Sequence, residues 1–270
     1  MDKKGRQYLF IPKKRLSQNF LIDNRTLKKI VYHAEILPTE TVLEIGPGFG
    51  TLTQIIQAKA QRVIAVEKDP VLAGFLQEKF KTNPKIKIII GDILDYKLLE
   101  YDKVVATPPY NISSKLLFQL IQRNCRVIVL TFQKEFAERL VSKPGTKNYG
   151  RLTVMINHKT KPELLDHIPR KAFRPQPKVD SAVVKIIPKE YIELVDEELF
   201  SDIVRGLFTQ RRRKLRSSLK HYINKKVPNF PIEILDKEIP DKRVYQMTVE
   251  DFEQLTKNLS LKLKKSHSKS

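Results

Sequence analysis

Residues 41–67 constrain the fold more than any other stretch of the chain. An apolar run at 41–45 leads directly into Gly46-Pro47-Gly48-Phe49-Gly50, which is followed by a helical pattern at 51–60 and a second apolar run at 62–66 that ends on Glu67. This order of strand, glycine turn, helix, strand and acid is typical of a nucleotide-binding βαβ unit. We therefore predict a parallel sheet that binds its ligand at the carboxyl ends of its strands.

The same alternation continues along the chain. Asp23 is a plausible N-cap for a helix to about residue 35, residues 149–158 fit either a helix or a strand, and residues 162–177 are punctuated by prolines. The remaining predicted elements are helices at 70–80 and 114–122 and strands at 86–90, 103–106, 126–132 and 181–187. This pattern predicts an α/β fold in which a Rossmann-like sheet comes first.

Beyond residue 188 the pattern changes to helices. We expect a catalytic domain at 1–188, a smaller C-terminal helical domain at 189–261 and a basic, disordered tail at 262–270. No acid occurs from residue 203 to residue 232, and Leu207, Phe208, Leu215 and Leu219 form an apolar stripe within this segment. The segment should pack this stripe on a core and expose its cations, among them Arg211, Arg212, Arg213, Lys214 and Arg216.

The charge balance favours a polyanionic partner. The chain has 51 Lys and Arg against 30 Asp and Glu, a formal net charge of +21, which indicates nucleic acid before a membrane surface. Its single cysteine, Cys125, can build neither a disulfide nor a cysteine metal cage. No apolar run is long enough to span a bilayer, and the Lys-rich N-terminus lacks a signal-peptide core, so we expect a cytoplasmic protein.

The predicted strand ends carry the candidate cofactor site. A dinucleotide fingerprint would require glycine at Thr51, whereas the spacing Glu44-x-Gly46-x-Gly48-x-Gly50 favours S-adenosylmethionine. Glu67 is placed to accept the two ribose hydroxyls of that cofactor, and Asp92 to accept its adenine amine. The alternatives are a purely structural glycine turn and an Asp92 that caps a helix.

A second candidate site follows the strand at 103–106, in Thr107-Pro108-Pro109-Tyr110. The two prolines stiffen the turn, so that the Thr107 hydroxyl and the Pro108 carbonyl could accept the two N–H groups of a planar exocyclic amine while the Tyr110 ring stacks on its base. Such an arrangement suits chemistry on a nucleobase amine. The alternative is a turn that closes a strand, with Tyr110 as packing.

With these residues in place, the chain closely resembles the ribosomal RNA adenine dimethyltransferases over nearly its whole length. The resemblance rests on several motifs, namely Gln18-Asn19-Phe20-Leu21, residues 44–50, Glu67, Gly91-Asp92-Ile93-Leu94, Pro109-Tyr110-Asn111-Ile112-Ser113, residues 173–184, Leu207-Phe208-x-Gln210-Arg211-Arg212 and residues 243–252. It implies transfer of two methyl groups from S-adenosylmethionine to N6 of each of two adjacent adenosines in the terminal hairpin of small-subunit ribosomal RNA.

The resemblance also assigns roles to individual positions. Thr107, Pro108 and Tyr110 would hold the target amine, and Phe173 would stack on the other face of the flipped adenine. The helical domain would bind the RNA and the immature small ribosomal subunit, a role that matches the RNA-contact candidates Arg211, Arg212, Arg213, Lys214 and Arg216. We further expect a monomer that needs no metal. The residues implied at the cofactor site are Gln18, Asn19, Leu21, Gly46, Glu67, Asp92 and Thr107.

Two positions depart from the family pattern. The family often has Leu or Ile at the position of Pro108, and it usually has Asn at the position of Thr107, where a longer or water-mediated hydrogen bond to the amine is expected from the shorter threonine. The departure at Thr107 leaves open a non-catalytic ribosome-assembly or transcription factor on the same fold. Two further alternatives are a large-subunit ribosomal RNA adenine methyltransferase of the antibiotic-resistance type, which the match at 207–212 argues against, and a DNA adenine methyltransferase, for which no sequence-reading module is evident.

Overall fold

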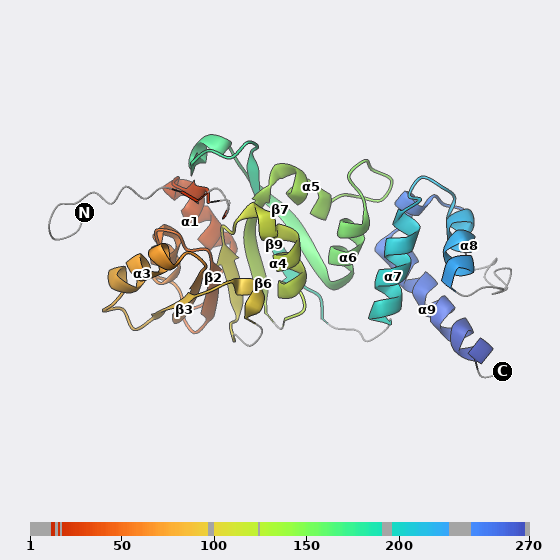
Figure 1. The fold of residues 1–270 in the computed structure, drawn as a ribbon, viewed down its shortest axis with the longest axis horizontal. Coiled ribbons are helices and arrows are strands. Elements are labelled where there is room, and N and C mark those ends of the chain that lie inside the picture. Colours follow the sequence, from red (N-terminus) through yellow and green to blue (C-terminus); the bar gives the residue numbers. More distant parts are fainter. Residues whose placement is uncertain are drawn as a thin grey trace. The chain divides into compact units, whose positions relative to one another are not determined.

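The computed structural model describes residues 12–13, 16, 18–96, 100–123, 125–190, 196–226 and 239–267 (Figure 1). The chain divides into two compact units, Met1–Ala137 with Glu163–Ile187, and Glu138–Pro162 with Pro188–Ser270. The chain passes from the first unit to the second for the last time at residue 188, which is the predicted domain boundary. The segment Glu138–Pro162, expected in the first domain, lies instead in the second unit. The roles predicted for the two domains stay predictions.

A seven-stranded sheet with the order β4-β3-β2-β5-β6-β9-β7 organises the first unit (Figure 1). Its first five members are parallel, as the sequence predicts, and β9 joins β6 in the antiparallel direction. The strands are β2 (Thr41–Ile45), β3 (Arg62–Glu67), β4 (Ile86–Ile90), β5 (Lys103–Ala106), β6 (Val127–Gln133), β7 (Thr160–Ile168) and β9 (Ser181–Pro188). The sheet is therefore mixed, with its parallel part leading to the candidate site.

Strand β7 was missed at the sequence level. Pro162 lies within it, and a proline removes a backbone donor from a ladder, so the proline-punctuated segment 162–177 was not predicted to contain a strand. In the sheet order β7 is the last strand, so one of its sides needs no partner. An edge strand tolerates proline for this reason.

Four described helices of the first unit follow the predicted pattern, namely α1 (Asn24–His33), α2 (Thr51–Ile56), α3 (Pro70–Lys79) and α4 (Ser113–Leu120). Helix α5 (Lys134–Leu140), whose last residues pass into the second unit, was not predicted. Asp23 caps α1 as predicted, since its carboxylate accepts the N–H of Thr26 at 3.0 Å. Helix α2 ends four residues before the predicted end, because the Ile56 carbonyl accepts the N–H groups of both Lys59 and Ala60 in a turn toward β3.

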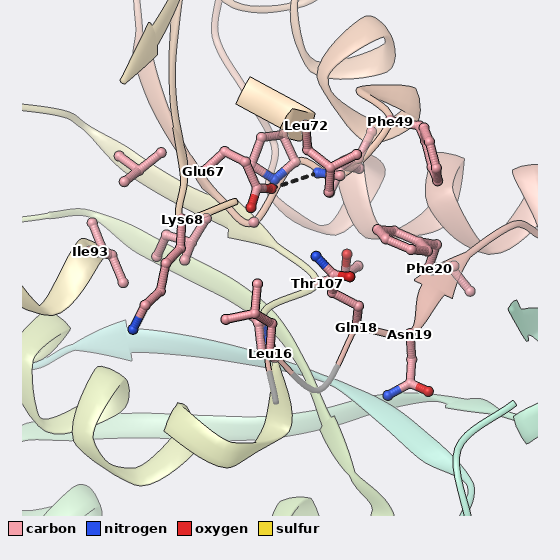
Figure 2. A pocket seen from close by; sticks show the side chains of 18 of the residues that line it. Leu16, Gln18, Asn19, Phe20, Phe49, Glu67, Lys68, Leu72, Ile93 and Thr107 are labelled. Carbon is pink, nitrogen blue, oxygen red and sulfur yellow. Dashed lines mark hydrogen bonds between the residues drawn. The ribbon is translucent and has the colours of Figure 1, made fainter. Parts of the chain in front are cut away.

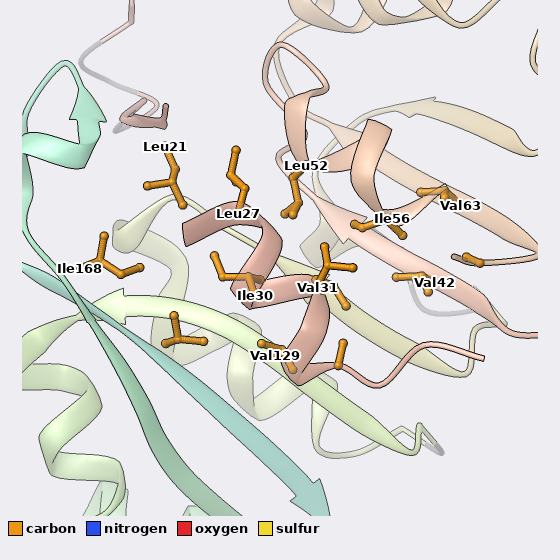
Figure 3. Packing of buried hydrophobic residues seen from close by; sticks show 14 of the residues in the cluster. Leu21, Leu27, Ile30, Val31, Val42, Leu52, Ile56, Val63, Val129 and Ile168 are labelled. Carbon is orange, nitrogen blue, oxygen red and sulfur yellow. The ribbon is translucent and has the colours of Figure 1, made fainter. Parts of the chain in front are cut away.

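The core of the first unit lies where α1 and α2 meet the sheet (Figure 3). The apolar face of α1 points toward side chains from α2 and from the strands, and Ile30 is fully buried there. Burial of this face stabilises the unit by roughly 1.5–3 kcal/mol for each large aliphatic side chain. A rigid core beneath the glycine turn fixes the positions of the strand ends that carry the site.

The second unit is helical and has its own core. Its elements are α6 (Arg151–Lys159), α7 (Glu197–Phe208), α8 (Leu215–Lys226), the 3₁₀ turn η6 (Val244–Gln246) and α9 (Val249–His267). Leu207, Leu215 and Leu219 are fully buried in this core, which confirms the predicted apolar stripe. Helix α6 also resolves the ambiguous segment at 149–158 in favour of a helix.

The predicted disordered tail at 262–270 is wrong for residues 262–267, which continue α9. The helix begins at Val249 with two acids in its first turn, and this favourable start supports propagation into the basic C-terminal residues. Residues 268–270 lie outside the described part of the chain.

Candidate functional site

A pocket in the first unit lies at the carboxyl ends of the parallel strands (Figure 2). It is lined by residues at or just beyond the ends of four of them, Gly46 after β2, Glu67 at the end of β3, Asp92 two residues after β4 and Thr107 after β5. Such an edge is where an open α/β sheet binds ligands, because the chain crosses to opposite faces there. The structure thus brings together four predicted residues that are 61 positions apart at their extremes, from Gly46 to Thr107.

The glycine turn forms one wall of this pocket. Gly46 and Gly48 have φ angles of +67° and +60°, a region that side-chain-bearing residues rarely adopt. A Cβ on Gly48 would lie 2.8 Å from the Phe20 ring, and one on Gly46 would lie 3.4 Å from Cδ of Pro109. The glycines therefore permit close approach between the turn, the N-terminal motif and the Pro-Pro turn.

Glu67 is held by the backbone on both sides. Its Oε2 accepts the N–H of Gly48 at 3.2 Å, and its Oε1 accepts the N–H of Asp69 at 2.8 Å (Figure 2). Burial raises the pKa of the Glu67 carboxyl, while these two N–H groups oppose that rise. Each oxygen keeps a free lone pair, so the carboxylate is oriented to accept hydroxyl donors from a ligand.

Asp92 combines the two roles that the sequence left open. Its Oδ1 accepts the N–H of Leu94 at 3.0 Å, which caps the short turn η2 (Ile93–Asp95), while the side chain also lines the pocket. Its Oδ2 accepts from Nζ of Lys68 at 2.5 Å. Burial raises the pKa of Asp92, but the hydrogen bonds from Lys68 and Leu94 outweigh it, so the pKa lies below its usual value.

Lys68 was missed by sequence reasoning. It lines the pocket beside Ile93 and brings a positive charge to the edge where Asp92 lies (Figure 2). Its only sequence signal is its position next to Glu67. That position alone does not tell on which side of the strand end an ammonium group will lie.

The N-terminal motif closes the pocket from another side. Gln18, Asn19 and Leu21 all line it, as predicted. The Gln18 amide donates to Oδ2 of Asp69 at 3.0 Å, and Lys13 donates to Oδ1 of the same carboxylate at 2.8 Å. Because Asp69 is fully buried and caps α3, these bonds tie the segment before β1 (Phe20–Leu21) to the end of β3.

Only some residues of the Pro-Pro turn line the pocket. Thr107 and Pro109 line the pocket, and the Thr107 hydroxyl makes no hydrogen bond with any residue that the structure describes. Pro108 is buried and Tyr110 is half-buried, and neither is among the lining residues. The Tyr110 hydroxyl lies 2.5 Å from Oγ of Ser181, and burial raises the pKa of Tyr110 to about 12, so the phenol is neutral.

Phe173 does not face the pocket in this structure. Its side chain is 1% exposed and packs in the core of the first unit, because β8 (Phe173–Arg174) pairs with β1 beside α1. Its ring meets Tyr110 edge to face, with centroids 6.4 Å apart. As the structure stands, Phe173 supports the Tyr110 ring and offers no free face to a base. Its predicted stacking role is therefore not seen here.

Glu44 carries an unsatisfied carboxylate oxygen beneath the glycine turn. The residue is 1% exposed, its Oε2 has no hydrogen-bond partner among the described residues, and burial raises its pKa to about 8. A buried carboxyl without a full set of partners lowers the free energy of unfolding. This destabilisation argues against a purely structural role for this strand end. The Glu44 carboxyl is thus protonated at neutral pH in the free protein.

The predicted RNA-binding cations lie in the second unit, around the turn between α7 and α8. Arg212 and Arg213 are exposed, whereas Lys214 forms an ion pair with Asp241 at 2.5 Å. Arg211 is half-buried and donates to the carbonyls of Thr146 and Lys147. Arg216 is exposed on α8. The cations therefore do not form one uniform outward face.

Two absences concern the part of the chain that the structure describes. No group of three or more His, Cys, Asp or Glu residues there could hold a metal ion. No described helix is both long enough and apolar enough to cross a membrane.

Solved structures of similar fold define the class of this protein. A dimethyladenosine transferase from Plasmodium falciparum aligns with a TM-score of 0.82 and 32% identity over 90% of this chain and 98% of its own. The 23S rRNA methyltransferase ErmE aligns with a TM-score of 0.69 and 29% identity over 89% of this chain and 99% of its own. The fold is that of the Rossmann-like, S-adenosylmethionine-dependent methyltransferases, and the pocket lies where such a sheet binds ligands.

Sequence comparison identifies the family. The model for ribosomal RNA adenine dimethylase matches residues 10–260, and the chain belongs to this family of adenine dimethyltransferases. A "Probable ribosomal RNA small subunit methyltransferase A" from Methanosarcina acetivorans is 41% identical over 87% of this chain and 88% of its own length. A protein of the same name from Thermococcus sibiricus is 39% identical over 94% of this chain and 96% of its own length. The resemblance expected from the motifs is confirmed.

Proposed function

We propose that this enzyme transfers two methyl groups from S-adenosylmethionine to N6 of each of two adjacent adenosines in the 3′-terminal hairpin of small-subunit ribosomal RNA, during maturation of that subunit. The names of the relatives from Methanosarcina acetivorans and Thermococcus sibiricus support the small subunit. One observation carries the proposal. The Thr107 hydroxyl, which has no hydrogen-bond partner among the described residues, lines the same pocket as Gly46, Glu67 and Asp92.

The residues of the pocket fit S-adenosylmethionine. The left-handed glycines allow a ligand close to the backbone, Glu67 has lone pairs for ribose hydroxyls, and Asp92 has one for an adenine amine. Gln18, Asn19 and Leu21 complete the wall. When bound, this cofactor would supply a methyl group on a positively charged sulfur.

The Pro-Pro turn would hold the acceptor. Thr107 Oγ and the Pro108 carbonyl would accept the two N–H groups of adenine N6, which turns the nitrogen lone pair out of the ring system. Tyr110, kept neutral and fixed by Ser181, would present its ring to the base. The target adenosine must leave its stack, and Phe173 would stack on it only after its side chain turns out of the core.

The helical unit would bind the ribosomal RNA and the immature subunit. Arg211, Arg212, Arg213, Lys214 and Arg216 are the proposed contacts, consistent with the net charge of +21. We propose further that the protein acts as a monomer in the cytoplasm and needs no metal for transfer.

Two other functions have a specific observation in their favour. The chain has Thr107 where the family usually has Asn, which favours a non-catalytic assembly factor that binds RNA and consumes no cofactor. The likeness to ErmE favours a large-subunit target. The proposed function ranks above both because Thr107 keeps an acceptor in the pocket and the relatives at about 40% identity carry small-subunit names.

One labelling experiment separates the three functions. The protein is incubated with methyl-labelled S-adenosylmethionine and immature small ribosomal subunits, and in a parallel reaction with large-subunit ribosomal RNA, and the modified adenosines are mapped. Label on two neighbouring adenosines near the 3′ end is expected. Label on large-subunit RNA alone would transfer the proposal to the ErmE-like function. No label, on a substrate that a relative methylates and that this protein binds, would support the assembly factor.

A substitution at Tyr110 tests the acceptor site. Tyr110→Ala should abolish methyl transfer while the affinity for S-adenosylmethionine stays within about twofold, because Tyr110 is outside the lining of the cofactor pocket. Calorimetric titration of the cofactor and turnover on the same subunits give the two readouts. Retained turnover would contradict the assignment of Tyr110.

A further inference from the structure

The short turn η2, which follows Asp92, is held from outside by the helix that comes after the Pro-Pro turn. Gln119 lies in α4, and its Nε2 donates to the Ile93 carbonyl at 3.1 Å and to the Tyr96 carbonyl at 3.2 Å. Ile93 is the first residue of η2, and Tyr96 is its C-cap. The two N–H groups of one side-chain amide thus hold both ends of the turn, across 26 and 23 positions of the chain.

Helix α4 is a firm support for this amide. Three of its leucines are at most 1% exposed, namely Leu116, Leu117 and Leu120. A helix packed in this way cannot shift without opening the core. Arg123, in the turn after the helix, also donates to the Tyr96 carbonyl. The helix begins directly after η3 (Tyr110–Ile112), so the element that continues from the Pro-Pro turn also fixes η2.

The loop at residues 90–96 has little structure of its own to fix it. Turn η2 has three residues, and the hydrogen-bond geometry of a 3₁₀ turn is poorer than that of an α-helix. The Tyr96 hydroxyl donates to the Ile90 carbonyl at 2.9 Å, and a Cβ on Gly91 would lie 2.6 Å from that hydroxyl oxygen. These contacts close the loop on itself, whereas the Gln119 amide fixes it to α4.

A single peptide group connects Gln119 to Asp92. The Ile93 carbonyl and the Leu94 N–H belong to the same planar peptide group. Gln119 donates to the oxygen of this group at 3.1 Å, and the N–H of the group donates to Oδ1 of Asp92 at 3.0 Å. The orientation that Gln119 gives to the peptide group therefore sets the direction of the Asp92 carboxylate. Two hydrogen bonds through one amide also polarise and strengthen each other.

We propose that Gln119 is a positioning residue for the adenine half of the cofactor, although it does not line the pocket itself. The inference rests on the proposed function, in which Asp92 accepts the adenine amine, and deepens it. A hydrogen bond to that amine depends on the direction of the carboxylate. A base with a carbonyl in place of the amine cannot donate to Asp92 and leaves it unpaired. Gln119 would therefore contribute to the selection of adenine.

The test compares two ligands on each protein. S-adenosylhomocysteine is the cofactor without its methyl group, and S-inosylhomocysteine has an oxo group in place of the adenine amine. Calorimetric titration without RNA gives both dissociation constants, and the ratio of the inosyl to the adenosyl value measures recognition of the amine. Gln119→Met keeps the length of the side chain and removes both donors, so this ratio should fall about 3–10-fold, the equivalent of one neutral hydrogen bond.

Gln122→Met is the matched control. Gln122 follows the same helix, is exposed and makes no hydrogen bond with any residue that the structure describes, so the ratio should stay that of the unaltered protein. Unfolded molecules bind neither ligand, and partial unfolding of a variant therefore lowers both apparent affinities equally and leaves the ratio unchanged. If Gln119→Met does not fold, Gln119→Asn takes its place, because its amide is too short to keep both hydrogen bonds and the ratio should again fall.

Turnover on immature small subunits gives a second readout. A loosened adenine site weakens binding in the ground state and in the transition state alike, so Gln119→Met should raise KM for S-adenosylmethionine and leave kcat within about twofold. A fold-stabilising residue would change neither constant of the folded enzyme. A lower kcat with an unchanged KM would place the effect at the acceptor turn and would overturn the proposal.

The outcomes separate this inference from the proposed function. Equal ratios for Gln119→Met, for Gln122→Met and for the unaltered protein would overturn the inference alone. An unaltered protein without preference for the adenosyl ligand would contradict the role of Asp92 in the proposed function, and the inference with it. A preference that depends on Gln119, in a protein that transfers no methyl group to small subunits, would support the inference and contradict only the proposed function.

Discussion

The Tyr110 hydroxyl lies 2.5 Å from Oγ of Ser181, although 71 residues separate them in the chain. Ser181 opens β9 and is fully buried, so the tyrosine at the acceptor site is fixed from the antiparallel strand of the sheet. Phe173 holds the same ring from its edge. The orientation of Tyr110 thus depends on a segment of the chain remote from the strand ends that form the pocket.

This relationship makes Ser181 a positioning residue. Ser181→Ala should lower kcat about fivefold, the equivalent of roughly 1 kcal/mol for one neutral hydrogen bond, with no change in cofactor affinity. A double-mutant cycle with Tyr110→Phe should show that the two changes are not additive. If Ser181 only stabilised the fold, Ser181→Ala would lower the melting temperature and leave kcat unchanged. The effects of the two substitutions in the cycle would then be additive.

Thr107 should contribute its oxygen rather than its shape. Thr107→Val keeps the β-branched form and removes the acceptor, so kcat should fall by about 10–100-fold, in line with the loss of one hydrogen bond of roughly 1.5–3 kcal/mol to a group that gains charge during transfer. Thr107→Ser, which keeps the hydroxyl, is the control. Steady-state turnover on immature small subunits measures both, and equal losses for Val and Ser would argue against an acceptor role.

Even the conservative substitution Glu67→Gln should weaken cofactor binding. Both of its oxygens accept a backbone N–H, and Glu67→Gln would turn an NH₂ group toward the N–H of Gly48 or of Asp69. We expect affinity for S-adenosylmethionine to fall about 10–100-fold, from roughly 1.5–3 kcal/mol of lost charged hydrogen bonding. Equilibrium dialysis provides the measurement. The control is Lys68→Gln in the same pocket, which should leave the Glu67 hydrogen bonds intact and lower the affinity for S-adenosylmethionine less.

Glu44 should make stability depend on pH. Its carboxyl has a pKa of about 8 in the folded chain against 4.5 in the unfolded chain, so between these values the folded state holds a proton that the unfolded state has released. The free energy of unfolding should therefore fall as pH rises from 4.5 to 8, with a contribution of up to about 1.4 kcal/mol per pH unit. Urea unfolding of the unaltered protein and of Glu44→Gln isolates this contribution, which the variant should lack.

Local patterns in the sequence predicted much of the fold. The parallel strands, the cap at Asp23 and the apolar stripe of Leu207, Leu215 and Leu219 follow from residue periodicity and capping chemistry, which act over a few residues. The prediction failed at β7, where Pro162 is tolerated because the strand lies at the edge of the sheet. An edge position is a property of the assembled sheet and has no signal in neighbouring residues.

The same division applies to the site. Gly46, Glu67, Asp92 and Thr107 could be named from the sequence, because in a parallel sheet all strands end at one edge and a strand end can be read from local pattern. The structure alone decided that Lys68 lies beside Asp92, that Ser181 holds Tyr110, and that Phe173 is buried.

The hydrogen bonds from Gln119 to η2 likewise needed tertiary structure, since 26 positions of the chain separate Gln119 from Ile93. The sequence by itself determined the family, the order of the elements and the residue types at the strand ends. Only the tertiary structure decided which side chains share a hydrogen bond or a cavity, because those contacts depend on packing between segments that periodicity does not relate.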